Sequence, residues 1–203
     1  DGKTHKVPAD LVLIAVGIAP NTDAVSKLGL EMDGRGIKVN NKMETSVKGV
    51  YAIGDVTGKY MLAHVASAEG IVAVEHMAGK QSFPINYSHV PSCVYSHPEV
   101  ARVGLTEEEA REFGYSIKVG KFSFQAIGKA LVFGDTNGFV KIITDEKTED
   151  VLGIHMVGPH VTDMISEAGL AKVLDATAWE ISKTIHPHPS LSEIFGEAAL
   201  AVE

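Results

Sequence analysis

The sequence is poor in cysteine and in positive charge. It has one cysteine, Cys93, and 18 lysine and arginine residues against 26 aspartate and glutamate residues in a chain of 203. One cysteine excludes an internal disulfide framework and a cysteine-based zinc site. The net charge of −8 argues against nucleic acids and anionic membranes as partners, because those surfaces repel an acidic protein.

Long apolar runs are also missing. No run approaches the roughly 18 residues of a transmembrane helix, and no basic stretch followed by an apolar one opens the chain. We therefore expect a cytoplasmic or matrix-like protein. The chain starts at Asp1 rather than at a methionine, and Asp1-Gly2-Lys3 is typical of a hairpin turn, so we expect a piece of a longer protein.

The first half of the chain contains two apolar runs that end in small or acidic residues. Residues 8–17 run continuously apolar up to Gly17, a pattern typical of a strand buried on both faces of a parallel sheet. A short strand is expected at 37–39 and another buried strand at 49–55, ending in Asp55. Ligands bind beyond the carboxyl ends of such strands, although an aspartate there can also be a simple turn residue.

Helical spacing follows. The apolar residues from Leu62 to Met77 recur every three or four positions, which predicts a helix over 62–78. Gly70 interrupts this helix, at a cost of about 1 kcal/mol relative to alanine, and indicates close packing against another element.

The second half has the pattern of an α+β domain. Pro84 and Pro91 indicate a domain boundary near residue 88. Thr106 and Glu109 have capping-box spacing at the start of a short helix that Gly114 ends. The expected strands of an antiparallel meander are 117–124, 138–144 and 151–157, and the expected helices after them are 163–176, 179–185 and 191–202.

A histidine-rich loop precedes the last helix. Pro187 and Pro189 stiffen this loop, and a helix that opens at Ser190 would bring Glu193 near His188. A carboxylate partner fixes the tautomer of a histidine that takes and returns a proton. The same spacing is also a capping box, in which Glu193 only binds the backbone of Ser190.

Four strings resemble one family in the same order along the chain. The string His186-Pro187-His188-Pro189-Ser190-Leu191-Ser192-Glu193 closely resembles the C-terminal signature of the dihydrolipoyl dehydrogenase family and, more loosely, that of glutathione reductase. The others are Tyr51-Ala52-Ile53-Gly54-Asp55, Met61-Leu62-Ala63-His64 leading into Ala68-Glu69-Gly70, and Tyr95-Ser96-His97-Pro98-Glu99-Val100 with Gly104.

The resemblance implies a fold and a domain order. Within the class I pyridine nucleotide-disulfide oxidoreductases, it implies an α+β interface (dimerisation) domain preceded by part of an α/β FAD/NAD-binding region. Residues 1–19 would be the tail of the NAD-binding domain, 20–87 the C-terminal part of the FAD-binding and central domain, and 88–203 the interface domain.

The resemblance also implies an activity. Members oxidise dihydrolipoamide to lipoamide through an enzyme disulfide and FAD, with reduction of NAD, for 2-oxo acid dehydrogenase complexes or the glycine cleavage system. The implied partners are a second copy of the chain, sharing each active site, and a lipoyl domain. The family's redox cysteine pair would precede Asp1, so the isolated chain is expected to be inactive.

Site residues carry over by resemblance. His188 and Glu193 match the acid/base pair, and Asp55 matches the residue that binds the ribityl chain of FAD. The stretch Met61-Leu62-Ala63-His64 matches residues against the flavin, where a helix N-terminus suits its negative charge. His64 could equally be a helix-cap or core histidine. Gly17 matches a glycine that contacts NAD, but Ile18-Ala19 stand where members often have a basic residue.

Several alternatives remain open. Cys93 is expected to be a buried, inert thiol, because no second cysteine lies nearby. A metal site could form from His186 and His188 with His97 or His89, although the spacing matches no known ligand pattern and we expect no metal. The chain could be a dimerisation module only, or part of another disulfide reductase that acts on glutathione or a similar dithiol.

Overall fold

The computed structural model describes residues 2–202, and the chain divides between Ile85 and Asn86 into two units. Within the described residues, no helix has both the length and the apolar character that crossing a membrane requires.

A five-stranded antiparallel sheet forms the centre of the second unit. Its strands are β3 (Ser92–Val94), β4 (Glu99–Gly104), β5 (Ile117–Ser123), β6 (Phe139–Asp145) and β7 (Val151–Gly158), in the order β3-β4-β7-β6-β5. The predicted meander is confirmed by β5, β6 and β7. Strands β3 and β4 were not predicted, because Pro91 precedes β3 and Pro98 precedes β4, and proline disfavours a strand assignment.

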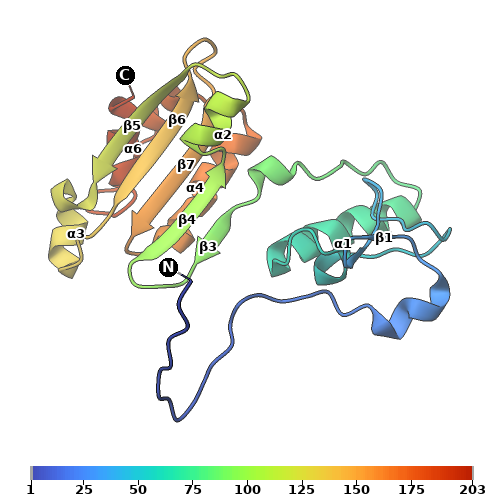
Figure 1. Ribbon diagram of the computed structural model, residues 1–203. Coiled ribbons are helices and arrows are strands. Elements are labelled where there is room, and N and C mark those ends of the chain that lie inside the picture. The colour runs from blue at the N-terminus through green and yellow to red at the C-terminus, as the bar shows by residue number, and fades with distance from the viewer. Residues whose placement is uncertain (1, 203) are drawn as a thin grey trace. The chain divides into compact units, whose positions relative to one another are not determined.

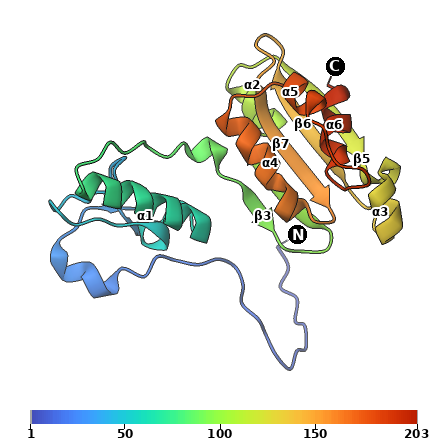
Figure 2. The same ribbon diagram turned by 180° about the vertical axis from the view of Figure 1, so that it is seen from behind.

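Helices cover both faces of this sheet. They are α2 (Glu107–Glu112), α3 (Gly128–Phe133), α4 (Val161–Val173), α5 (Ala178–Lys183) and α6 (Glu193–Leu200), with the 3-10 turns η3 (Tyr87–His89) and η4 (Phe124–Ala126). Figure 2 shows α4, α5 and α6 on one face, and Figure 1 shows α2 on the other. The predicted capping box of α2 is present, with both Thr106–Glu109 hydrogen bonds.

Strand alternation divides the core between these faces. Ile142 and Ile143 are adjacent on β6 and fully buried, but they belong to different apolar clusters because successive side chains point to opposite faces. Ile142 packs in the larger cluster with residues of α4 and α6, whereas Ile143 packs with Ala110 of α2. The α+β class of this half is thereby confirmed.

Direct backbone contact fixes α6 on the sheet. Gly120 of β5 lies so close to this helix that a Cβ added there would be 2.1 Å from the carbonyl oxygen of Ala198. Only glycine permits this approach. The contact holds α6, which carries Glu193 in its first turn, against the sheet.

The first unit is smaller. It contains η1 (Asp23–Leu28), a hairpin of β1 (Met32–Asp33) and β2 (Gly36–Ile37), η2 (Gly54–Thr57) and α1 (Ala63–Met77). The helix predicted over 62–78 is confirmed by α1. Gly70 packs as expected, since a Cβ there would lie 3.3 Å from Cδ1 of Ile53.

Two strand predictions in this unit are wrong. Residues 8–17 form no strand, and their apolar side chains are exposed, Leu11 at 88%. A strand buried on both faces needs neighbouring strands on either side, and none of the described residues pairs with this segment. Residues 49–55 contribute only an isolated bridge between Glu44 and Tyr51 before η2 begins. The strand expected at 37–39 corresponds to β2, which is shorter and begins one residue earlier, at Gly36.

Candidate active site

The histidine-rich loop joins α5 to α6. It leaves α5 after Thr184, whose backbone is extended, and it runs through Pro187 and Pro189 to the start of α6 at Glu193. The helix was expected to open at Ser190 and begins three residues later, after Ser192. Helix α6 is well anchored, because Ile194 and Phe195 in its first turn are fully buried.

His188 and Glu193 are in direct contact. The Nδ1 atom of His188 lies 2.8 Å from Oε1 of Glu193, and the side chains are 78% and 27% exposed. The other carboxylate oxygen, Oε2, accepts a hydrogen bond from the backbone N–H of Ser190 at 2.9 Å. That N–H, followed by the His188 ring, holds the pKa of Glu193 below its ordinary value.

This contact bears on both readings of the motif. Glu193 binds the backbone N–H of Ser190 as the capping-box reading expected, but Ser192 is the N-cap residue of α6, so no capping box forms. The hydroxyl of Ser190 pairs with that of Ser192 at 2.9 Å. A neutral His188 that donates Nδ1–H to Glu193 keeps a lone pair on Nε2. Such a ring can accept a proton from an external donor, and the carboxylate then stabilises the imidazolium.

A second histidine–carboxylate pair lies on the same loop and was missed. Nε2 of His186 lies 2.8 Å from Oε1 of Glu167 on α4, and only 8% of the His186 side chain is exposed. The two residues are 19 positions apart, so local spacing gives no signal for this pair. The one local signal is Gly196, a glycine within α6, because the His186 ring packs against the helix at that position.

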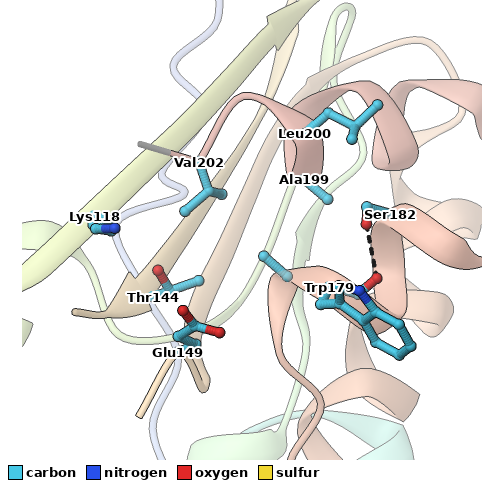
Figure 3. A pocket seen from close by; sticks show the side chains of 9 residues that line it. Lys118, Thr144, Glu149, Trp179, Ser182, Ala199, Leu200 and Val202 are labelled. Atoms are coloured by element: carbon cyan, nitrogen blue, oxygen red, sulfur yellow. Dashed lines mark hydrogen bonds between the residues drawn. The ribbon is translucent and has the colours of Figure 1, made fainter. Parts of the chain in front are cut away.

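Two hollows of the second unit differ in their relation to the loop. One, of about 380 Å³, is bordered by Pro189, Ser190, Leu191 and Ser192, and faces Phe133 and Met164. The other, of about 230 Å³, is shown in Figure 3 with Trp179, Ser182 and Lys118 around it. No residue of 186–193 lines that second hollow, so it is separate from the candidate site.

In the first unit, Asp55 is exposed on η2. The turn is fastened to α1 by Glu69, whose Oε2 accepts the backbone N–H of Gly54 at 2.6 Å. Glu69 is 1% exposed, and Ala66 of α1 leaves no room for a side chain at Gly54. Glu69 belongs to one of the matching strings, with no role predicted for it, and in the structure it supports the turn that carries Asp55.

The stretch Met61-Leu62-Ala63-His64 begins α1. Leu62 is the N-cap residue and supplies no side-chain hydrogen bond to the helix. Ala63 and His64 are exposed, and Met61 and Leu62 are half-buried. A helix of 15 residues presents the positive end of its dipole here, which suits a negatively charged group. Gly17 lies in an exposed segment without regular secondary structure, with φ 131°.

The remaining candidates are Cys93 and a metal site. Cys93 is half-buried on β3, and burial raises the pKa of its thiol, which favours the protonated, unreactive form. Among residues 2–202, no group of three or more histidine, cysteine, aspartate or glutamate side chains is arranged to hold a metal ion. His186 and His188 point to separate carboxylates rather than to a shared ligand.

Comparisons with known proteins agree with this arrangement. A family model described as the dimerisation domain of pyridine nucleotide-disulphide oxidoreductases matches residues 90–199, and a model described as pyridine nucleotide-disulphide oxidoreductase matches residues 1–70. The chain is 55% identical to dihydrolipoyl dehydrogenase of Bacillus subtilis over its whole length, and 46% identical over 98% of it to the mitochondrial dihydrolipoyl dehydrogenase of Canis lupus familiaris.

A solved structure is also similar. The HOCl-induced flavoprotein disulfide reductase RclA from Escherichia coli superimposes with a TM-score of 0.89 at 29% identity, over 96% of this chain and 46% of that one. The chain spans 43% and 40% of the lengths of the Bacillus and Canis relatives.

Proposed function

The chain belongs to the pyridine nucleotide-disulphide oxidoreductase family, and from this premise we propose that it is the C-terminal part of a dihydrolipoyl dehydrogenase. The whole enzyme oxidises dihydrolipoamide to lipoamide with reduction of NAD. The contact between Nδ1 of His188 and Oε1 of Glu193, at 2.8 Å on an exposed ring, is the observation that carries the proposal.

The dithiol substrate explains the need for this pair. A free thiol has a pKa of about 8.5 and is mostly protonated at pH 7, whereas the attacking species is the thiolate. His188 takes that proton on Nε2, and Glu193 holds the ring in the required tautomer and stabilises the imidazolium. His188 and Glu193 are thus the proposed catalytic residues of this chain.

The first unit has groups that suit the binding of FAD. We propose that Asp55 and the start of α1, residues Met61, Leu62, Ala63 and His64, contribute to an FAD site. An exposed carboxylate on a turn held by Glu69 suits hydroxyl groups, and a helix N-terminus suits negative charge. FAD bound there would supply the electron transfer between the enzyme disulfide, once the dithiol has reduced it, and NAD. Gly17 is the proposed contact to NAD, although Ile18 and Ala19 lack the basic group common there.

The proposed domains follow the expected boundaries. Residues 1–19 belong to the NAD-binding domain, 20–87 to the FAD-binding and central domain, and 88–203 to the interface domain. The division between Ile85 and Asn86 and the start of the dimerisation-domain match at residue 90 support the boundary near residue 88. We also propose a cytoplasmic location, since a single cysteine suits a reducing compartment.

The proposed partners are a second copy of the chain and the lipoyl domain of a 2-oxo acid dehydrogenase complex. The match to a dimerisation domain supports the homodimer. Light scattering on the purified chain at micromolar concentration is expected to give twice the mass of 21.6 kDa. A monomeric mass at that concentration contradicts the dimer.

An activity assay tests the function. The isolated chain is expected to form no NADH from dihydrolipoamide, because its one cysteine cannot form the redox pair. The full-length protein is expected to be active, and His188→Gln to lower its rate by about 10²- to 10⁴-fold. His160→Gln, at another exposed histidine paired with a carboxylate, is the matched control. Reduction of glutathione disulfide, with no turnover of dihydrolipoamide, would favour the other disulfide reductases.

A further inference from the structure

The loop before α6 holds two histidine–carboxylate pairs of opposite exposure. The side chain of His188 is 78% exposed, and that of His186 is 8% exposed, although each ring lies 2.8 Å from a carboxylate oxygen. A ring as buried as His186 cannot exchange a proton with a substrate. Its pairing with Glu167 must therefore serve another purpose than direct proton transfer.

His186 is held from two helices at once. Glu167 of α4 binds its Nε2 at 2.8 Å. The ring of Phe195 on α6 stacks against it, with centroids 6.5 Å apart and planes inclined by 10°. The ring also lies beside Gly196 of α6, where a Cβ would be in van der Waals contact with it, 3.4 Å from Nδ1. These contacts fix His186 relative to the same helix that carries Glu193.

The link from His186 to His188 is short and stiff. Only Pro187 separates the two histidines, and its ring restricts φ to about −65°. The far end of the loop is fixed too, because Glu193 binds the backbone N–H of Ser190. A change in the position of His186 must therefore move His188 relative to Glu193.

We propose that His186, held by Glu167 and stacked on Phe195, is a positioning residue that sets the orientation of His188 toward Glu193. The proposal rests on the proposed function, in which His188 accepts the proton of the dithiol. In this arrangement Nε2 of His186 donates to Glu167, so the ring serves as a fixed donor that holds the loop.

The tautomer of His188 is the direct readout. In the chain labelled with ¹⁵N-histidine, the neutral His188 ring is expected to carry its proton on Nδ1, because that atom donates to Glu193. The His188→Gln variant assigns the signal. Glu167→Ala releases His186 and is expected to lower the share of the Nδ1–H form. Glu167→Gln keeps an acceptor for Nε2–H and is expected to retain it.

A matched control comes from the same helix. Asp163→Ala removes another α4 carboxylate, which lies 3.8 Å from Nδ1 of the exposed His160, and is expected to leave the His188 signal unchanged. If Glu167→Ala does not fold by circular dichroism, Glu167→Asp replaces it. The shorter side chain withdraws the carboxylate from His186, so the proposal expects loss with aspartate and retention with glutamine.

Turnover by the full-length protein is the second readout. Misplacing a catalytic group by about 1 Å can cost about 10²-fold, so Glu167→Ala is expected to lower kcat by about 10- to 100-fold with KM within about twofold. Glu167→Gln is expected to restore kcat. An unchanged His188 tautomer in a folded Glu167→Ala or Glu167→Asp protein overturns the positioning role.

The two measurements distinguish the positioning role of His186 from the proposed proton transfer by His188. A changed tautomer with undiminished kcat keeps the positioning role and overturns the proposed proton transfer. A normal tautomer and normal kcat in Glu167→Ala, beside an inactive His188→Gln, overturns the positioning role and keeps the function.

Discussion

Glu193 meets the ring of His188 with one carboxylate oxygen, at 2.8 Å from Nδ1. Its second oxygen accepts the backbone N–H of Ser190 at 2.9 Å. One side chain therefore binds the backbone of the loop before α6 and orients the candidate base. Because the carboxylate also binds the loop backbone, it cannot move away from the ring without losing that hydrogen bond, which makes the pair more rigid than an ordinary surface contact.

Glu69 is expected to stabilise the turn that carries Asp55. Glu69→Ala leaves the buried N–H of Gly54 without its acceptor at 2.6 Å, which costs about 1–3 kcal/mol in the free energy of unfolding. Urea denaturation of the chain measures this loss. Glu75→Ala, at a half-buried position of the same helix, is the control and is expected to cost less than Glu69→Ala. Equal stability of the Glu69 variant and the wild type contradicts the role of Glu69.

The sequence predicts elements whose stability is local. The apolar spacing predicts α1 to within one residue at each end, and Thr106 and Glu109 predict the start of α2, because both depend on residues three or four positions apart. The strand predicted over residues 8–17 was wrong because a buried strand depends on residues far away in the sequence. Its strand pattern specifies burial against neighbouring strands, and none of the described residues provides them.

The same distinction applies to the site. The spacing of His188 and Glu193 left a cap and a catalytic partner as alternatives, since it cannot show which oxygen of Glu193 binds which group. The pairing of His186 with Glu167 across 19 residues depends on how α4 packs beside α6. Long-range packing of this kind has no periodicity in the sequence and requires the fold.

Glu99 is expected to contribute to acid stability. Its carboxylate accepts the backbone N–H of Thr162 at 3.0 Å and the hydroxyl at 2.7 Å, in the first turn of α4. The backbone N–H holds the pKa of Glu99 below its ordinary value. The carboxylate therefore stabilises the fold above its unfolded pKa of about 4.3, and this contribution is lost as pH falls through the lower folded pKa.

Glu99→Gln tests this contribution. At pH 7 the variant is expected to be less stable than the wild type by about 1 kcal/mol, the typical value of one such hydrogen bond. The difference is expected to shrink as the pH falls below about 4, where the wild-type carboxyl takes up its proton. Glu108→Gln, at an exposed position of α2, is the control in the same denaturation series. A difference that stays constant with pH contradicts the assignment.

His155 is expected to make stability depend on pH near neutrality. Its Nε2 donates to the carbonyl oxygen of Leu105 at 2.8 Å, and burial lowers the pKa of the ring. The folded state therefore favours the neutral form. The stabilisation is complete above the unfolded pKa of about 6.5 and is lost as pH falls through the lower folded pKa.

Thermal unfolding from pH 7.5 to pH 5 measures this effect. The wild type is expected to lose stability over this range, and His155→Gln, which keeps an N–H donor but cannot be protonated, is expected to lose less. His160→Gln changes an exposed histidine and serves as the control. Identical pH profiles for His155→Gln and the wild type contradict the role of His155.

The last prediction concerns the partner of His188. The resemblance implies that this histidine works on the flavin and disulfide of the other subunit. Two inactive forms of the full-length protein are then expected to rescue each other. One carries His188→Gln, which keeps bulk and removes the base, and the other carries serine in place of the first redox cysteine of the longer protein. In a mixed dimer, one of the two sites is complete.

The exposure of His188 makes this test decisive. The ring is 78% exposed and its Nε2 is not engaged by Glu193, so it can reach a group supplied by another chain. Removing a general base costs about 10²- to 10⁴-fold, so recovery of even a few per cent of activity exceeds the background of either parent. Heterodimers that are as inactive as both parents contradict the shared site, and the contact of Glu193 with Ser190 then remains only a structural contact of the loop.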